Sequence, residues 1–452
     1  MRARWLFVAS LSAAGCAFGG RVPADYPQIQ AETKPEAAPG PTVQEDEASV
    51  AKEARLDALT RVALAKSPLV AEARARAQAA VARVKASGRF PDLQLKYEIF
   101  GQPLNKPWAL GSAQMHMFGV RLTLPPAGSL DAQTRIAMED AKIAIGTLRT
   151  RELDVVSEVH KAWSLYWASE HEKGIHADHM EVTSKLLALA RVQLVGGKTT
   201  QGDLLRFELE VSKIHGDVLV LEQQKVTSRA RLNALMGRAV EAPLGPPAEP
   251  AAPVVAPRIE DVRAFVLKKR PEIAAATASV KKSEAAVDAA NSEAKWPMVM
   301  VGLDYQLMPM APMPHAYGAM VQFSLPWLSS QRSEEVKAAQ AGVEADKATV
   351  KAIESAILLQ VQEALARYDA QRSTLQLVET KLLPQAKKTF DATLANYGAG
   401  GGEALSVVDA ERTWLQMRIE RSRAIAQVEI ALADIERALG APLSALGKKS
   451  AP

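Results

Sequence analysis

The chain repeats itself once, and this repetition limits its fold more than any other feature. The segment "VALAKSPLVAEARARAQAAVARVKA" from Val62 aligns with "FVLKKRPEIAAATASVKKSEAAVDA" from Phe265. Near the other end of the unit, "LVGGKTTQGDLLRFE" from Leu194 aligns with "YGAGGGEALSVVDAE" from Tyr397. Both pairs are offset by 203 residues. An offset that is the same at both ends predicts a tandem duplication of one structural unit.

The duplication divides the chain into six segments. A Pro-rich stretch, "EAPLGPPAEPAAPVVAP", separates the two copies and is typical of a linker. We expect a signal peptide at 1–15, an extended tether at 16–48, a first repeat at 49–240, the linker at 241–257, a second repeat at 258–443 and a short tail at 444–452.

Each copy combines helical and strand periods. Apolar residues recur every three or four positions over 50–88 and 258–294, which predicts helices. A helix over 332–395 would be about 95 Å long at about 1.5 Å per residue, with a kink expected at Pro384. Such a length implies a coiled coil with neighbouring helices. A second helix is expected to follow in each copy, at 203–237 and 405–440.

Two short segments with a period of two interrupt the helices of each copy. They predict strands at about 91–101, 112–124, 297–308 and 316–325. One face of each strand is apolar and the other is polar, which is typical of a membrane barrel with a wet lumen, although a soluble sheet alternates in the same way. Trp296 and Trp327 flank the second hairpin like an interfacial girdle. Four strands cannot close a barrel and an open edge cannot face lipid, so oligomerisation is expected.

The ordered set of these motifs resembles the TolC-type outer membrane efflux proteins. The resemblance rests on "ALAKSPLV" at the start of the first copy, on "LP" after each hairpin and on "YGAGGGEALSVVDAE" after the long helix. It covers about residues 50–443. It implies a mainly α fold with a small membrane β-barrel, built as a homotrimer with a shared twelve-stranded barrel and an α-helical coiled-coil tunnel. The implied role is a passive exit duct in the outer membrane of Gram-negative bacteria, engaged by a periplasmic adaptor (a membrane fusion protein) and an inner-membrane pump.

The resemblance also assigns roles to residues around the glycine turns. Gly197 and Gly400 occupy the turn between the tunnel helices, which implies a periplasmic tip that contacts the adaptor. Asp203 and Asp409, and more weakly Glu403, lie near acidic positions that line the closed aperture in the family. Their alternative role is to stabilise helix N-termini, since carboxylates are favourable in the first turn.

Methionines are concentrated around the predicted strands. Three of them and a histidine occur in "MPMAPMPH", from Met308 to His315, at the expected tip of the second hairpin. Thioethers and imidazoles are soft ligands for Cu(I) and Ag(I), whereas methionine also fills gaps in ordinary cores. We expect transient contacts to exported metal ions at the lumen, consistent with the heavy-metal branch of the family, or simple filling of the lumen. The residues concerned are Met115, Met117, Met298, Met300, Met308, Met310, Met313 and Met320.

The N-terminus predicts export. "MRARWLFVASLSAAGC" has two arginines, a short apolar segment and small residues before Cys16, the one cysteine in the chain. This arrangement resembles a bacterial lipoprotein signal, in which Cys16 becomes the acylated N-terminal residue and anchors the protein to outer membrane lipid. A chance cysteine in an ordinary signal peptide is the alternative.

Composition and motifs exclude several other functions. A net charge of +4 is too small to indicate a nucleic-acid partner. The histidines of "HEKGIHADH" (171–179) have the wrong spacing for a zinc protease, and we expect them on a solvated helix face. Neither enzyme activity nor a cofactor is expected. One alternative function is a multidrug or type I secretion duct of the same fold. Another, of a different class, is a periplasmic coiled-coil adaptor or a structural lipoprotein.

Overall fold

The structure is a computed structural model that describes residues 23–34, 42–197, 199–251, 257–309, 311–399 and 403–443. The chain divides into two compact units. The first contains the described residues within Met1–Lys34, Arg74–Thr147 and Glu272–Ile353, and the second those within Pro35–Ala73, Leu148–Pro271 and Glu354–Pro452. The boundaries between the units that follow Ala73, Thr147, Pro271 and Ile353 each fall within a helix.

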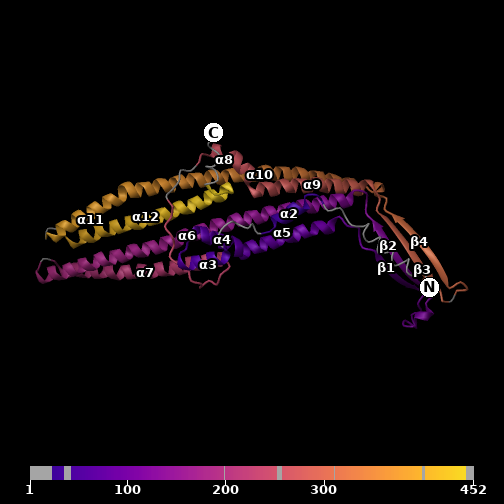
Figure 1. The fold of residues 1–452 in the computed structure, drawn as a ribbon, viewed down its shortest axis with the longest axis horizontal. Helices are drawn as coiled ribbons and strands as arrows, with labels where there is room; N and C mark the ends of the chain where they lie inside the picture. The colour runs from indigo at the N-terminus through magenta and orange to yellow at the C-terminus, as the bar shows by residue number, and fades with distance from the viewer. Residues whose placement is uncertain are drawn as a thin grey trace. The chain divides into compact units, whose positions relative to one another are not determined.

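The first unit contains one antiparallel sheet (Figure 1). Its strands are β1 (Gln94–Phe100), β2 (Met115–Leu124), β3 (Val299–Leu307) and β4 (His315–Phe323), in the spatial order β1-β2-β3-β4. Their ends lie within three residues of the positions predicted from alternation. Since β2 pairs with β3, the sheet joins the two hairpins of the chain, and β1 and β4 are its edge strands.

Helices adjoin the sheet in the first unit. α9 (Pro271–Lys295) is linked by ion pairs to two long helices, α6 (Ser129–Val195) and α10 (Gln331–Leu377). Arg135 of α6 pairs with Asp288 at 2.8 Å, and Arg332 of α10 pairs with Glu293 at 3.0 Å. These contacts connect segments that are far apart in the sequence.

The prediction of an extended tether over 16–48 is wrong for its described residues. α2 (Tyr26–Glu32) is a helix that buries Tyr26 and Ile29, with Lys85 over the Tyr26 ring at 4.8 Å. The second half of the segment contains the start of α3 (Val43–Lys52). In α2 the apolar Tyr26 and Ile29 lie three residues apart on one helix face, and in α3 Thr42 caps the N-terminus. These local features favour helices although the segment is rich in Pro and Glu.

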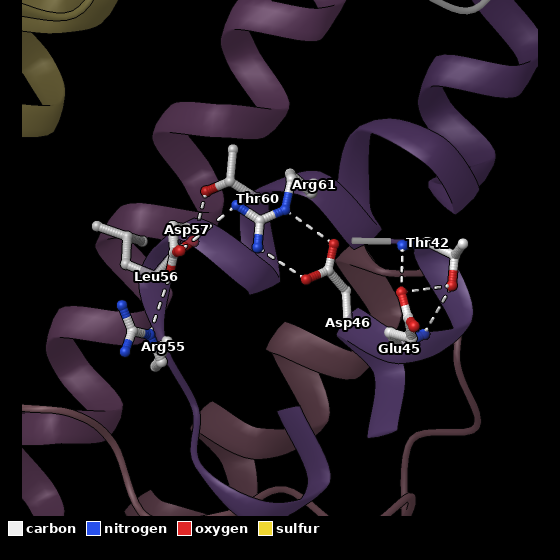
Figure 2. A network of polar contacts seen from close by, with 8 residues as sticks. All are labelled: Thr42, Glu45, Asp46, Arg55, Leu56, Asp57, Thr60 and Arg61. Atoms are coloured by element: carbon white, nitrogen blue, oxygen red, sulfur yellow. Dashed lines mark hydrogen bonds and ion pairs between the residues drawn. The ribbon is translucent and has the colours of Figure 1, made fainter. Parts of the chain in front are cut away.

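In the second unit, α3 and α4 (Leu56–Lys66) are joined by the polar network of Figure 2. Thr42 and Glu45 form a capping box, in which the Glu45 backbone N–H donates to Thr42 Oγ1 and the Glu45 side chain accepts from the Thr42 backbone N–H. Arg61 donates two hydrogen bonds to the buried Asp46 carboxylate, at 2.8 and 2.7 Å. The pKa of Arg61 is raised, chiefly by this hydrogen bonding. The ion pair thus fixes α3 against α4.

Two helical pairs form the rest of the second unit. The C-terminal part of α6 runs beside α7 (Gln201–Leu235), and α11 (Leu383–Gly398) runs beside α12 (Ala404–Leu439) (Figure 1). α8 (Ile259–Lys269) contacts α12. The order of helices and strands from α4 to α7 recurs from α8 to α12. The helical segments predicted at 50–88 and 258–294 are each interrupted, and a new helix begins at Pro68 and at Pro271, because proline is favoured in the first turn of a helix.

Pro384 is accommodated by a local change of helix type. A π-helical turn at Val378–Leu382 joins α10 to α11, and the Leu383 N–H donates to the Val378 carbonyl five residues earlier. Proline has no N–H and its ring clashes with the preceding turn, so a wider turn relieves the interruption without ending the helix. Among the described residues, no helix is long and apolar enough to cross a membrane.

Candidate functional site

One face of the sheet presents apolar side chains to the surroundings. Its cross-strand rows follow from the register. They are Leu95–Val120–Leu303–Ala319, Tyr97–Phe118–Tyr305–Tyr317 and Leu122–Val301–Val321. Leu95 is 82% exposed, Leu303 71% and Tyr317 86%. An apolar face this exposed in one chain indicates that something outside the chain covers it.

An aromatic row crosses the apolar face near the hairpin loops. The Tyr97 and Phe118 rings are 4.9 Å apart, and the Tyr305 and Tyr317 rings are 5.6 Å apart. The Tyr97 hydroxyl and His116 Nδ1 form a hydrogen bond of 2.9 Å. Aromatic pairs across strands stabilise a sheet, and a band of tyrosines suits an interface that is apolar on one side and wet on the other.

The opposite face is polar and alternates large with small residues. Its rows are Gln94–Arg121–Gly302–Met320, Lys96–Gly119–Asp304–Gly318, Glu98–Met117–Gln306–Ala316 and Thr123–Met300–Gln322. A Cβ atom at Gly119 would lie 2.2 Å from Asp304 Oδ1, so the carboxylate fills the space that the glycine leaves. Lys96 and Glu98 form an ion pair on β1.

The methionines singled out in the sequence lie on the polar face of the sheet, at both ends of its strands and in the second loop. Met117, Met300 and Met320 lie on the polar face, in the rows given above. Met115 begins β2 and Met308 follows β3, so both lie at the loop end of the sheet. Met298 is 43% exposed just before β3, and Met313 is 79% exposed in the second loop. Met310 lies outside the described residues.

Gly197 lies at the turn between α6 and α7, as the sequence predicts. Its φ of +67° is a left-handed conformation that favours glycine. Three residues later, the Thr200 side chain accepts from the Asp203 N–H while the Asp203 carboxylate accepts from Thr200 and Thr199. Hydrogen bonding from the Thr200 side chain is the main cause of the lowered pKa of Asp203. Asp203 thus stabilises the N-terminus of α7, and its role in gating stays a prediction.

The other acidic candidates lie beside the second turn. Glu403 is the N-cap of α12, without a side-chain capping hydrogen bond, and Asp409 is exposed two turns later. Gly400 lies outside the described residues, as does Cys16. The roles of these residues in gating, adaptor contact and lipid anchoring stay predictions.

An apolar cluster packs the two turns together within the second unit. It contains buried residues of α6, α7, α11 and α12, namely Leu186, Ala190, Phe207, Phe390, Tyr397, Ala404, Val407, Val408 and Ala410. Phe207 is fully buried, and its ring is 6.5 Å from that of Tyr397. Burial raises the pKa of Tyr397, the aromatic residue that begins the second glycine motif. This cluster links the α6–α7 hairpin to the α11–α12 hairpin.

The prediction of a solvated helix face for "HEKGIHADH" is wrong for Glu172, His176 and His179, whereas His171 is half-buried. Glu172, His176 and His179 are each at most 5% exposed. They are covered because α12, more than 200 residues later in the sequence, packs against α6. Within the described residues, no group of three His, Cys, Asp or Glu side chains could hold a metal ion.

The contact between α6 and α12, called the seam below, is a series of polar pairs that sequence reasoning missed. His160 Nε2 is 2.8 Å from Glu429 Oε2, Arg423 donates to both Glu172 oxygens at 3.1 and 3.0 Å, and Thr183 donates to Glu411 at 3.0 Å. Two signals could have found it. On α12, Glu411 lies at helical spacing from the apolar Ala404, Val407 and Val408. On α6, His179 and Thr183 lie at helical spacing from the apolar Leu186 and Ala190.

Comparisons with known proteins agree with this geometry. The sequence matches the family described as outer membrane efflux protein at residues 59–238 and 265–441. No curated protein matches it. The fold is similar to that of a Pseudomonas aeruginosa membrane protein (20% identity, 90% of this chain and 96% of that one, TM-score 0.74). It is also similar to CusC (16%, 86% and 92%, TM-score 0.73) and to the Neisseria gonorrhoeae MtrE outer membrane channel (16%, 86% and 89%, TM-score 0.71).

The match spans two long segments that together contain most of the chain, including all four strands and the long helices that connect them. The chain belongs to the outer membrane efflux protein family.

Proposed function

We propose that this protein is the outer-membrane exit duct of a tripartite efflux system in a Gram-negative bacterium. Three copies would close their four-stranded sheets into one twelve-stranded barrel, with the apolar faces toward lipid and the polar faces toward the lumen. The helices would continue the duct into the periplasm, where a periplasmic adaptor and an inner-membrane pump engage it. Cys16 would add a lipid anchor.

The exposed apolar face of the sheet is the observation that carries this proposal. Water is an unfavourable environment for rows in which Leu95, Leu303 and Tyr317 are more than two-thirds exposed. Tyr305 lies nine positions after Trp296, which is ~30 Å along an extended chain, or about 23 Å across the membrane at a tilt of ~40°. That distance fits the ~25 Å apolar band between the aromatic girdles of outer-membrane barrels.

The turns and their apolar cluster support adaptor contact at the glycine turns of the proposed duct. Gly197 turns the chain sharply, and Val192 and Val195 beside it are 71% and 92% exposed. Exposed apolar side chains at the end of a helical hairpin are available to an adaptor's helices. Asp409 and Glu403 would contribute carboxylates to a ring at this end, made threefold by symmetry.

The position of the methionines supports a soft metal ion, Cu(I) or Ag(I), as cargo. Met117, Met300 and Met320 lie on the polar face of the sheet, whereas methionines that only fill a core belong on an apolar one. Thioether contacts suit these ions, and weak contacts at successive levels allow an ion to leave as readily as it enters. A multidrug or type I secretion duct of the same fold is the alternative cargo class.

Fractionation and conductance test the duct itself. The purified full-length protein should migrate as a heat-labile trimer from outer-membrane fractions and should form discrete channels in a planar lipid bilayer. A soluble periplasmic monomer, as expected for an adaptor or a structural lipoprotein, would refute the proposal.

The cargo is tested separately with the triple substitution Met117→Leu, Met300→Leu and Met320→Leu. It should lower copper and silver tolerance of the host while export of organic compounds is unchanged, because leucine keeps the volume and removes the thioether. Met236→Leu, at a fully buried position in the second unit, is the matched control. Unchanged metal tolerance in the triple variant would end the soft-metal proposal but not the duct.

A further inference from the structure

The seam contains two histidines that no role proposed above uses. His176 is 5% exposed, and its Nδ1 has no hydrogen-bond partner among the described residues. His171 lies one turn and a half earlier on α6 and stacks on the buried Trp167 ring at 4.8 Å. His176 Nδ1 therefore lacks the hydrogen-bond acceptor that an imidazolium requires, and the Trp167 ring offers no such acceptor on the face of His171 that it covers.

Across the seam, α12 presents arginines that already have partners. Arg418 pairs with Asp178 at 2.6 Å, Arg421 with Glu379 at 2.9 Å, and Arg423 with Glu172 at 3.0 Å. Glu172, the carboxylate that acts on both histidines, is thus engaged by Arg423. A proton added to either histidine places a further positive charge beside a row of arginines.

The remaining charged groups around the histidines come from every neighbouring element. His176 faces Glu172 and His179 of α6, Asp217 of α7 and Arg423 of α12. His171 faces Glu172 of α6, Glu249 of the segment after α7, and Arg418 and Arg421 of α12. The acidic members of these sets favour protonation, and the cationic members oppose it.

Burial is the larger influence in both cases. Desolvation lowers the pKa of His171 and of His176 despite the nearby carboxylates. A base whose pKa is lower in the closed seam than in water binds fewer protons when the seam is closed. The closed seam is therefore favoured above the ordinary histidine pKa of about 6.5 and loses that advantage as the pH falls below it.

His179 is a third buried histidine of the seam. Its Nε2 lies 3.3 Å from Glu411 Oε1, and both side chains are buried. Substituting each separately distinguishes their effects.

We propose that the seam is a proton-responsive latch, in which protonation of His171 and His176 against the paired arginines of α12 separates α12 from α6. In the exported protein this latch would respond to the pH of the periplasm. Separation of the helices would loosen the end of the duct that contains the glycine turns. This last consequence rests on the proposed function, whereas the latch itself does not.

Hydrogen-exchange mass spectrometry of the full-length protein in detergent at pH 7.5, 6.5 and 5.5 tests the latch. After correction for intrinsic exchange, peptides covering 172–183 and 407–423 should lose protection as the pH falls. The loss is limited to about tenfold per pH unit for each histidine that takes up a proton. Peptides from the sheet serve as an internal reference.

The variants His171→Gln and His176→Gln keep a neutral polar side chain at every pH. Each alone should remove part of the acid-induced loss, and the double variant should remove most of it. His215→Gln on α7, where the histidine is exposed, is the matched control and should behave as the parent protein does. Because each variant is compared with itself at pH 7.5, a change in its overall stability does not obscure the result.

Acid-induced loss that persists undiminished in the double variant, or that disappears in His179→Gln alone, would overturn the latch. Planar-bilayer recording then addresses the duct. Channels whose conductance rises between pH 7.5 and 5.5 in the parent but not in the double variant support both proposals. An absence of channels would refute the duct and leave the exchange result to decide on the latch.

Discussion

Removing one aromatic ring from the apolar cluster between the two turns should uncouple the hairpins locally. Phe207 is fully buried among residues of four helices, and its ring is 6.5 Å from that of Tyr397. Replacing a buried Phe by Ala costs about 3–5 kcal/mol, from lost transfer energy and from the cavity left behind. A local loss of about 4 kcal/mol corresponds to about 1,000-fold faster exchange of the amides that depend on the cluster.

Hydrogen exchange at constant pH measures this effect, in peptides from the ends of α11 and α12 nearest to the turns. Leu205→Ala provides the matched control, because Leu205 lies on the same helix two residues away and is 56% exposed. It should change protection by no more than about 0.5 kcal/mol, as expected for surface substitutions. Equal effects of the two substitutions, or a Phe207→Ala effect confined to α7, would show that the cluster does not join the hairpins.

Three further substitutions test other contacts. Gly119→Val places a side chain where Asp304 Oδ1 lies and should destabilise the sheet by about 1–3 kcal/mol in urea unfolding, whereas adding Asp304→Ala should recover most of the loss. Asp203→Asn should cost about 1 kcal/mol of local helix stability. Since hydrogen bonding from Thr200 lowers the pKa of Asp203, the parent should lose this stabilisation as the pH falls through the lowered pKa, while the variant should show no such step. Asp46→Ala should weaken the packing of α3 on α4 by about 2 kcal/mol of stability. The loss should be below the ~3–5 kcal/mol of a fully buried ion pair because the Arg61 side chain is 33% exposed. Limited proteolysis at α3 would report the loss.

The sequence predicted the local elements well, because their periods are properties of neighbouring residues. Alternation located β1 to β4, and the three-and-four spacing located the long helices. The turn at Gly197 followed from its place between two helical patterns, and the structure adds that its backbone is left-handed. The π-helical turn before Pro384 was beyond such reasoning, since a period does not distinguish a kink from a wider turn.

Burial that depends on distant segments was not predictable in the same way. His176 and His179 look like solvated residues on an isolated helix, and only the packing of α12 covers them. The hydrogen bonds from Thr199 and Thr200 to Asp203 show that it stabilises the start of α7, while gating by this residue stays a prediction. The buried Glu411, placed within an apolar stripe, was one of the two readable signs that the helix packs against another polar surface.

The edge strands β1 and β4 have a genetic consequence. Within the described residues, each pairs with a strand on one side alone. In the proposed twelve-stranded barrel, hydrocarbon would supply no partner for the backbone groups on the other side, so a copy with a damaged edge would leave its neighbours incomplete as well. We expect alleles that disrupt β1 or β4 to be dominant over the wild type when co-expressed, because one defective subunit spoils an assembly to which intact subunits also contribute.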